Sequence, residues 1–222
     1  MNSLIGLPQK LQFFKNIVTT KVFTASGTWN KPAGCKWIKV IVTGGGAGGA
    51  AAYTNGTSTY GIPGCAGAAG GTAIKIIDVT NINSVIVTIG SGGALGNYPN
   101  GGGSGGTSSF GSYCSATGGT GVGYGNIGGG TPGVGSNGNI NLYGSSTDNL
   151  WEEPSTGDIY VMAGPRGGDS YWRGAGYGAY GGNSGSAYNW GSGGGGGAWY
   201  AGTCYSGGNG AAGVCVVEEY YA

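Results

Sequence analysis

Four long glycine-rich spans constrain this chain more than any other feature. They cover residues 44–71, 90–106, 118–138 and 164–213, and they hold most of the 57 glycines among the 222 residues. Glycine in a helix interior costs about 1 kcal/mol relative to alanine, so helix is nearly excluded there. Glycine also has no side chain to pack across neighbouring strands, so pleated sheet gains little. We therefore predict extended threads of the polyproline II type, which glycine allows to approach closely and to hydrogen-bond to one another.

Such a glycine content is also typical of disordered chains, and this alternative needs an argument. Hydrophobic residues make up 39% of the chain and aromatic residues 11%, whereas disordered chains are poor in aromatic and β-branched residues. The strict period of collagen is absent, so a triple helix is not predicted. We therefore expect a folded bundle of polyglycine-like threads joined by exposed loops.

Short segments between these spans have the features of β-strands, being rich in β-branched and aromatic residues and bounded by glycine. Strands are predicted at residues 21–24, 36–43, 72–78, 84–89 and 213–221, with a hairpin formed by residues 107–110 and 114–117. The predicted fold class is all-β: a β-sandwich base with polyglycine II-like threads and exposed loops. Residues 7–14 are expected either as a short helix after Pro8 or as an extended arm, and no other helix is expected.

Alternation of side chains assigns the residues of these strands to faces. Ile38, Val40 and Val42 share one face because successive side chains of a strand point to opposite sides. Trp29 and Trp37 are expected in the core, whereas Glu218 and Glu219 are expected in solvent. We divide the chain into an attachment segment, residues 1–20, and a glycine-rich β domain, residues 21–222. Within the domain, residues 21–118 are strand-rich, residues 119–212 are rich in polyglycine and loops, and residues 213–221 form the closing strand.

Charge and histidine content exclude several classes of function. The chain has 9 Lys and Arg against 8 Asp and Glu, which gives no electrostatic footprint for nucleic acid or for an anionic membrane. It has no histidine, which removes the commonest general base and the commonest metal ligand. The five cysteines are scattered and odd in number, so they are expected as buried thiols rather than as a zinc site or a disulfide framework. No metal, cofactor or nucleic acid is expected as a partner.

Two further patterns favour neither a membrane segment nor a nucleotide site. Residues 1–20 lack the features of a signal peptide, and no apolar stretch is long enough to span a bilayer. Gly44, Gly46 and Gly49 have the spacing of a dinucleotide-binding loop, which needs a following helix and a later acidic residue. Neither is present, so the spacing is attributed to the glycine content alone.

Three segments resemble the glycine-rich domain of bacteriophage and prophage tail fibres. The first runs through Phe23-Thr24, Ser26-Gly27-Thr28, Trp29 and Pro32-Ala33-Gly34 into a hydrophobic strand and the glycines of 44–49; the others are residues 101–119 and 213–221. The chain is more loosely similar to the tip adhesins of T-even-type phages. The resemblance implies a receptor-binding fibre tip, with other fibre subunits as partners and a homotrimer as its assembly; a monomeric cap is the alternative.

Tyrosine and tryptophan are concentrated in or beside loops rich in Gly, Ser and Asn, a mixture that binding surfaces favour. The candidate receptor-binding residues are the loop aromatics Tyr53, Tyr60, Tyr143, Trp151, Tyr171, Trp172, Tyr177, Tyr180, Tyr188, Trp190, Trp199, Tyr200 and Tyr205. Some of these rings are expected to shield the threads instead, and about half are expected to be exposed for binding.

The sequence thus predicts a non-enzymatic module that adheres to a surface protein or polysaccharide of a bacterium. It is expected in the virion, at the fibre tip, after synthesis in the host cytoplasm without a signal peptide. Two other classes stay open. Asp148, Glu152, Glu153 and Asp158 form an acidic cluster that could serve a fibre-borne glycan hydrolase. A passive structural or ice-binding protein would instead need a flat surface of repeated small residues.

Overall fold

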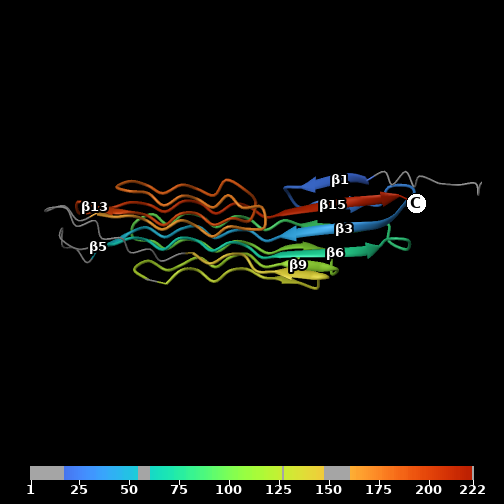
Figure 1. The fold of residues 1–222 in the computed structure, drawn as a ribbon, viewed down its shortest axis with the longest axis horizontal. Coiled ribbons are helices and arrows are strands. Elements are labelled where there is room, and N and C mark those ends of the chain that lie inside the picture. Colours follow the sequence, from blue (N-terminus) through green and yellow to red (C-terminus); the bar gives the residue numbers. More distant parts are fainter. Residues whose placement is uncertain (1–17, 55–60, 127, 148–160, 222) are drawn as a thin grey trace, which may run out of the picture.

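The strands and the threads occupy opposite ends of an elongated molecule. The computed structural model describes residues 18–54, 61–126, 128–147 and 161–221. Figure 1 shows the larger strands gathered at one end and long wavy threads at the other, both running along the long axis. The chain ends at the strand end, beside the strands β15 and β3.

Two five-stranded antiparallel sheets make up the strand end. The first has the order β1 (Val18–Phe23), β15 (Val214–Tyr221), β3 (Cys35–Thr43), β6 (Thr72–Asp78) and β11 (Ile140–Leu142). The second has the order β10 (Gly135–Ser136), β9 (Cys114–Ala116), β8 (Ser108–Phe110), β7 (Ser84–Thr88) and β2 (Gly27–Asn30).

Two small sheets lie at the thread end. One consists of β12 (Val161–Met162), β13 (Trp199–Tyr200) and β14 (Thr203–Cys204), and the other pairs β4 (Tyr53–Thr54) with β5 (Gly61–Ile62). No helix occurs among the described residues, and hence none that could cross a membrane. The predicted all-β class is confirmed.

The hydrophobic core lies between the two large sheets. Ile38, Val40 and Val42 of β3 are buried there, as their alternation predicts, together with Trp29 of β2 and Phe110 of β8. The rings of Trp29 and Phe110 lie 5.9 Å apart in a tilted contact. These large side chains bury much apolar area between the two sheets and so help to hold them face to face.

Three expectations at the strand end are wrong. Trp37 is 48% exposed, because it alternates with Ile38 and therefore points away from the core. Glu219 is only 1% exposed, because it shares the inward face of β15 with Val217. The strand β1 begins at Val18, so the last three residues assigned to the attachment segment pair with β15.

Hydrogen bonds from three strands hold the buried Glu219 carboxylate. The indole Nε1 of Trp29 donates to it at 2.8 Å, and the hydroxyl of Thr19 donates at 2.5 Å. The ammonium of Lys21 lies 3.3 Å away and the Tyr221 hydroxyl 3.1 Å away. Burial alone would raise the pKa of Glu219, but these donors outweigh it and hold the pKa below its usual range.

The glycine-rich spans form threads that are joined by backbone hydrogen bonds with a period of three. In the thread of residues 44–52, every third backbone N–H donates to the same neighbouring thread. Residues 44, 47 and 50 donate to carbonyls of residues 65–71, and residues 45, 48 and 51 donate to carbonyls of residues 100–106. Residues 46, 49 and 52 donate to carbonyls of residues 205–211. Three residues per turn is the period of polyproline II. The predicted polyglycine II-like threads are therefore present.

The same thread accepts hydrogen bonds from three further threads. Gly93 and Gly96 donate to it from one side, Gly119 from a second, and residues 194 and 197 from a third. Residues 44–52 thus form a central thread with six neighbours, and all nine are buried. Gly44, Gly46 and Gly49, with their dinucleotide-like spacing, belong to this thread, and no helix follows them.

Close contact between backbones explains the glycines of the central thread. A Cβ atom added to Gly46 would lie 1.9 Å from the carbonyl oxygen of Ser192, and one added to Gly49 would lie 1.9 Å from that of Gly195. Ala47 and Ala50 of the same thread are buried without such a collision, because their methyl groups point between neighbours. The chain passes repeatedly between sandwich and bundle, so the boundary at residue 118 does not separate them in space.

Candidate functional site

Six of the predicted aromatic residues lie on one part of the bundle, between residues 171 and 190. They are Tyr171, Trp172, Tyr177, Tyr180, Tyr188 and Trp190, all exposed except the half-buried Trp172. We call this set the aromatic ridge. Its members come from a turn at 170–173, from two neighbouring threads at 174–180 and 184–189, and from a turn at 189–191.

Five of the six ridge rings contact one another in two groups, and the group that contains Trp172 also packs against the sandwich. Trp172 is perpendicular to Tyr171 and to Trp190, with ring centroids 5.0 and 5.6 Å apart. Tyr177 stacks on Tyr188 at 6.4 Å. The indole Nε1 of Trp172 donates to the hydroxyl of Thr43 at 3.0 Å, and its ring packs on a small apolar cluster of β3 and β15. The ridge is therefore anchored where the first sheet passes into the bundle.

Backbone hydrogen bonds fix the two threads that carry the ridge. The Tyr188 N–H donates to Gly174 at 2.7 Å, and the Gly185 N–H donates to Tyr177 at 3.0 Å. In a thread with three residues per turn, Tyr177 and Tyr180 point to the same side, about 9 Å apart along the thread. The exposed rings therefore stand on a fixed backbone and not on a free loop.

Two buried serines hold the turn at 170–173. The hydroxyl of Ser170 donates to the carbonyl of Trp190 at 2.5 Å and accepts from the N–H of Trp172 at 3.1 Å. The hydroxyl of Ser192 donates to the carbonyl of Arg173 at 2.6 Å. The hydroxyls of these two buried serines thus link the turn at 170–173 to the turn at 189–191 by hydrogen bonds.

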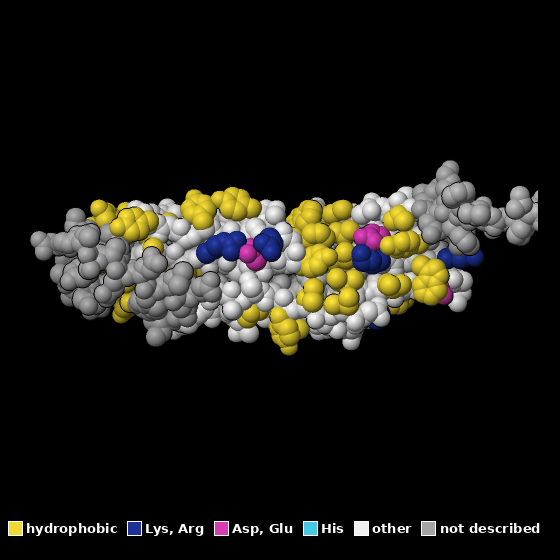
Figure 2. Space-filling view, viewed as in Figure 1, with side chains coloured by type: hydrophobic (Ala, Val, Ile, Leu, Met, Phe, Trp, Pro, Cys, Tyr) yellow, Lys and Arg dark blue, Asp and Glu magenta, His cyan; other side chains and the backbone are white. Residues whose placement is uncertain are grey.

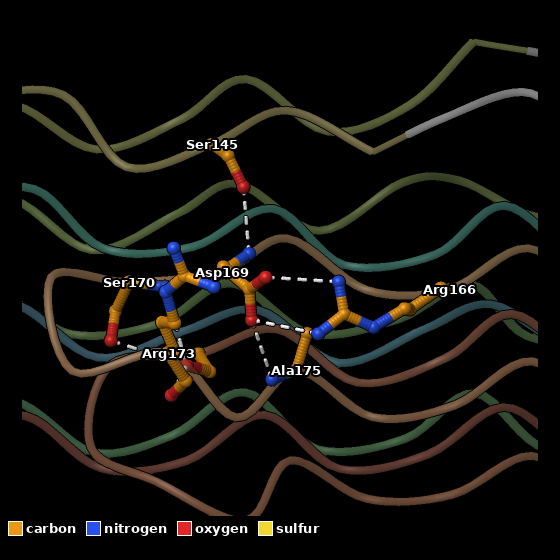
Figure 3. Close-up of polar contacts among 7 residues, drawn as sticks. Ser145, Arg166, Asp169, Ser170, Arg173 and Ala175 are labelled. Carbon is orange, nitrogen blue, oxygen red and sulfur yellow. Dashed lines mark hydrogen bonds and ion pairs between the residues drawn. The ribbon is translucent and has the colours of Figure 1, made fainter.

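Three charged residues, Arg166, Asp169 and Arg173, accompany the ridge, and the first two form an ion pair. The guanidinium of Arg166 makes two hydrogen bonds of 2.9 Å to the two carboxylate oxygens of Asp169 (Figure 3). The N–H of Ala175 also donates to this carboxylate, at 3.0 Å. Partial burial would raise the pKa of Asp169, but the hydrogen bonds from Arg166 and Ala175 outweigh it and lower the pKa. The carboxylate is therefore ionised and fully engaged at neutral pH.

Tyr53 lies apart from the ridge, in a tyrosine cluster at the thread end. Its ring is 5.1 Å from that of Tyr124, which is 5.6 Å from that of Tyr98. Burial, assisted by the neighbouring Tyr98, raises the pKa of Tyr124 to about 12. Tyr98 and Tyr124 are absent from the predicted set, although both stand in glycine- and asparagine-rich turns of the kind that selected the others.

The remaining predicted residues are dispersed. Trp199 is 1% exposed and packs on Ala52 and Met162, so its expected exposure is wrong; the strand β13 turns its ring toward the central thread, where Gly61 leaves room for it. Tyr200 and Tyr205 are half-buried. Tyr143 is 76% exposed but is bridged to Val134, away from the ridge in the chain.

Several predicted residues lie outside the described part of the chain. Among the candidate aromatics these are Tyr60 and Trp151, and the whole acidic cluster of Asp148, Glu152, Glu153 and Asp158 lies outside it as well.

Cysteine and acidic residues form no metal site in the described ranges. No three side chains of His, Cys, Asp or Glu are grouped there so as to hold an ion. All five cysteines are free thiols; four are buried, as expected, and Cys204 is half-buried. Burial raises the pKa of Cys114 to about 11, so this thiol stays protonated at neutral pH.

Comparison with known proteins places the chain in a family. No curated protein sequence matches it. The profile of a family described as a glycine-rich domain matches residues 19–220, from the first strand to the last and across every thread between them. The chain therefore belongs to this glycine-rich domain family.

Proposed function

We propose that this chain is the receptor-binding tip of a phage or phage-like tail fibre, which adheres non-covalently to the surface of a bacterium. The observation that carries the proposal is the aromatic ridge: six tyrosine and tryptophan side chains gathered on a fixed part of the bundle. The motifs shared with tail-fibre glycine-rich domains supply the biological setting, a virion protein made in the host cytoplasm.

A binding role suits the ridge for two physical reasons. Tyrosine and tryptophan contribute a large contact area while few rotatable bonds are immobilised, and the serine, glycine and asparagine residues around them supply adaptable hydrogen bonds. The backbone beneath them is fixed by hydrogen bonds between threads, so little further ordering opposes association. This proposal assigns adhesion and no catalysis to the chain, with either a surface protein or a polysaccharide as receptor.

We further propose that copies of this chain associate through the outer face of the first sheet, as a homotrimer or beside other fibre subunits. Apolar residues form a row across its five strands: Val22, Val216, Ile41, Ile74 and Ile140. Val22 and Ile140, at the two ends of the row, are exposed, whereas Ile41 and Val216 in its middle are buried and pack against Trp172. Ile76, on the same face, is 60% exposed, and Figure 2 shows hydrophobic side chains gathered over the strand end around an acidic and basic pair. Such a patch is typical of an interface.

Charge favours a second copy of the chain as the occupant of this face. Lys39 and Glu218 lie 3.4 Å apart within it and leave the face electrically balanced, so that each charge can meet its opposite on another copy. Repeated receptor sites in one assembly would raise avidity without new contacts. A monomeric cap on another fibre protein is the competing arrangement, and the measured mass of the assembly distinguishes the two.

Binding to a panel of Gram-negative cells tests the adhesive function. We would compare fluorescently labelled wild-type protein with a variant carrying Tyr177→Ala, Tyr180→Ala and Tyr188→Ala, which removes exposed rings and leaves the anchoring Trp172 intact. Tyr143→Ala, which removes an exposed ring outside the ridge, is the matched control. We expect strain-selective binding that falls at least about tenfold in the triple variant, since exposed anchor residues carry more than about 1 kcal/mol each. Equal binding by the two variants would contradict the proposal.

A further inference from the structure

Among the described residues of the bundle, charged side chains are few and lie close together in the chain. In the described threads, from residue 44 to 54, 61 to 71, 90 to 106, 117 to 134, 143 to 147 and 163 to 213, only Arg166, Asp169 and Arg173 carry charge. Figure 2 shows a single group of basic and acidic side chains on this half, with hydrophobic side chains beside it. Its net charge is one positive charge, next to the aromatic ridge.

Asp169 is already engaged by Arg166 and by the backbone. A carboxylate offers about four lone-pair positions, and Arg166 fills two of them while the N–H of Ala175 fills a third. The backbone of Gly174, next to this carboxylate, also helps to lower its pKa. Among the described residues, the guanidinium of Arg173 has neither a hydrogen-bond partner nor an ion-pair partner. Its donors therefore face solvent.

The backbone at Arg173 is held in a conformation that is rare for a residue with a side chain. Its φ angle is 59°, a left-handed conformation that costs a non-glycine residue about 1 kcal/mol. The hydroxyl of Ser192 fixes its carbonyl, and the same short turn carries Tyr171 and Trp172. These constraints fix the backbone from which the Arg173 side chain projects.

We infer that Arg173, together with the rings of Tyr171 and Trp190, forms a subsite for an anionic sugar: a saccharide bearing a carboxylate or a phosphate, within a bacterial surface polysaccharide. The planar guanidinium matches both oxyanions with paired hydrogen bonds. The aromatic rings offer apolar faces to the C–H face of a sugar ring. The inference rests on the proposed adhesive function and narrows its receptor from protein or polysaccharide to acidic polysaccharide.

Titration calorimetry with three polysaccharides tests the inference. Polygalacturonate carries a carboxylate on each sugar, a phosphomannan carries phosphate, and dextran is neutral. We would compare the wild-type chain with Arg173→Asn, since asparagine tolerates the left-handed conformation, and with Lys36→Asn, which removes the same charge from an exposed position on the sandwich. We expect binding to at least one anionic polymer, weakening with added salt. Arg173→Asn should reduce this affinity about tenfold, as loss of a charge-assisted pair does, and Lys36→Asn should not.

Three results separate the inference from the function on which it rests. Equal binding of dextran, or an unchanged affinity of Arg173→Asn for the anionic polymers, overturns the anionic subsite. If the protein binds bacteria but neither anionic polymer, and protease treatment of the cells abolishes this binding, the anionic subsite is overturned while the adhesive function stands. Binding of an anionic polymer that depends on Arg173, with no bacterial strain bound, supports the subsite and counts against the tail-fibre role.

Discussion

Replacing Gly49 by alanine should destabilise the protein more than the addition of one methyl group suggests. Gly49 lies in the central thread, where its N–H donates to Gly208 at 2.9 Å and its carbonyl accepts from Gly96 at 2.8 Å. A Cβ at this position would lie 1.9 Å from the carbonyl oxygen of Gly195, whereas real Cβ atoms stay at least 3.0 Å from such atoms. One of the two threads must therefore move by more than 1 Å.

The magnitude follows from the bonds that this movement disturbs. Besides the two bonds of Gly49, the thread of Gly195 donates to Gly185 at 3.1 Å and accepts from Gly208 at 2.8 Å. Each backbone bond contributes about 1 kcal/mol net, and an overpacked interior adds about 1–3 kcal/mol. With the bonds weakened rather than lost, we expect a loss of roughly 4 kcal/mol, or a melting temperature lower by about 10 °C for a chain of this length.

Gly182→Ala is the matched control, because a Cβ added there meets no atom within 4 Å. It should leave stability unchanged or raise it by up to about 1 kcal/mol, since alanine restricts the unfolded chain. Thermal and urea unfolding, followed by circular dichroism and tryptophan fluorescence, measure both variants. Melting temperatures of Gly49→Ala and Gly182→Ala within about 2 °C of each other would refute the close packing on which the reasoning depends.

Two further variants test the sandwich. Glu219→Gln should lower the free energy of unfolding by about 2 kcal/mol at neutral pH, because it removes charge-assisted bonds from a buried carboxylate. The pKa of Glu219 is lower in the folded than in the unfolded protein, so this stability is present above the unfolded pKa and is lost as the pH falls through the folded pKa. Urea midpoints of variant and wild type should therefore converge in acid, and a constant gap between them would contradict the assignment. Ile76→Lys on the outer face should weaken self-association at least about tenfold in sedimentation experiments, given the apolar area of one isoleucine. Ile86→Lys, on the other sheet, should not, although Ile86 is even more exposed, at 70% against 60%; equal effects would exclude the outer face as the interface.

Strand positions and the thread conformation could be predicted because both depend on local sequence. Alternation identified the buried face of β3, and the exclusion of helix and pleated sheet left only the threefold thread. The same alternation could have placed Glu219 correctly, since it stands two residues from the buried Val217. Glu219 was expected in solvent because it is charged, although its position in the strand predicts burial. The donors that make its burial tolerable come from strands distant in the chain.

The neighbours of each thread could not be predicted, because the bonds between threads join backbone groups that are the same at every residue. Register then decides which ring faces outward: Trp190 is exposed and Trp199 is buried, although both stand beside long runs of glycine. A spacing of three was the available signal, since Tyr177 and Tyr180 lie on one side of a threefold thread. Arg173 follows Trp172 directly in the chain, so its place beside the ridge is local, whereas the contact between this turn and the turn at 189–191 forms only in the folded bundle.

A bundle of this kind separates the residues that stabilise it from those that bind. Between its threads most hydrogen bonds run from backbone to backbone, so most outward side chains contribute little to the fold, whereas an inward glycine such as Gly49 cannot be replaced freely. Side-chain hydroxyls add to these bonds at certain places: Ser184 bonds the backbone of two threads, and Ser170 and Ser192 hold the turn at 170–173. At this turn the serine hydroxyls fix the backbone that carries Tyr171, Trp172 and Arg173, and a change of either serine would therefore disturb the side chains that we propose for binding.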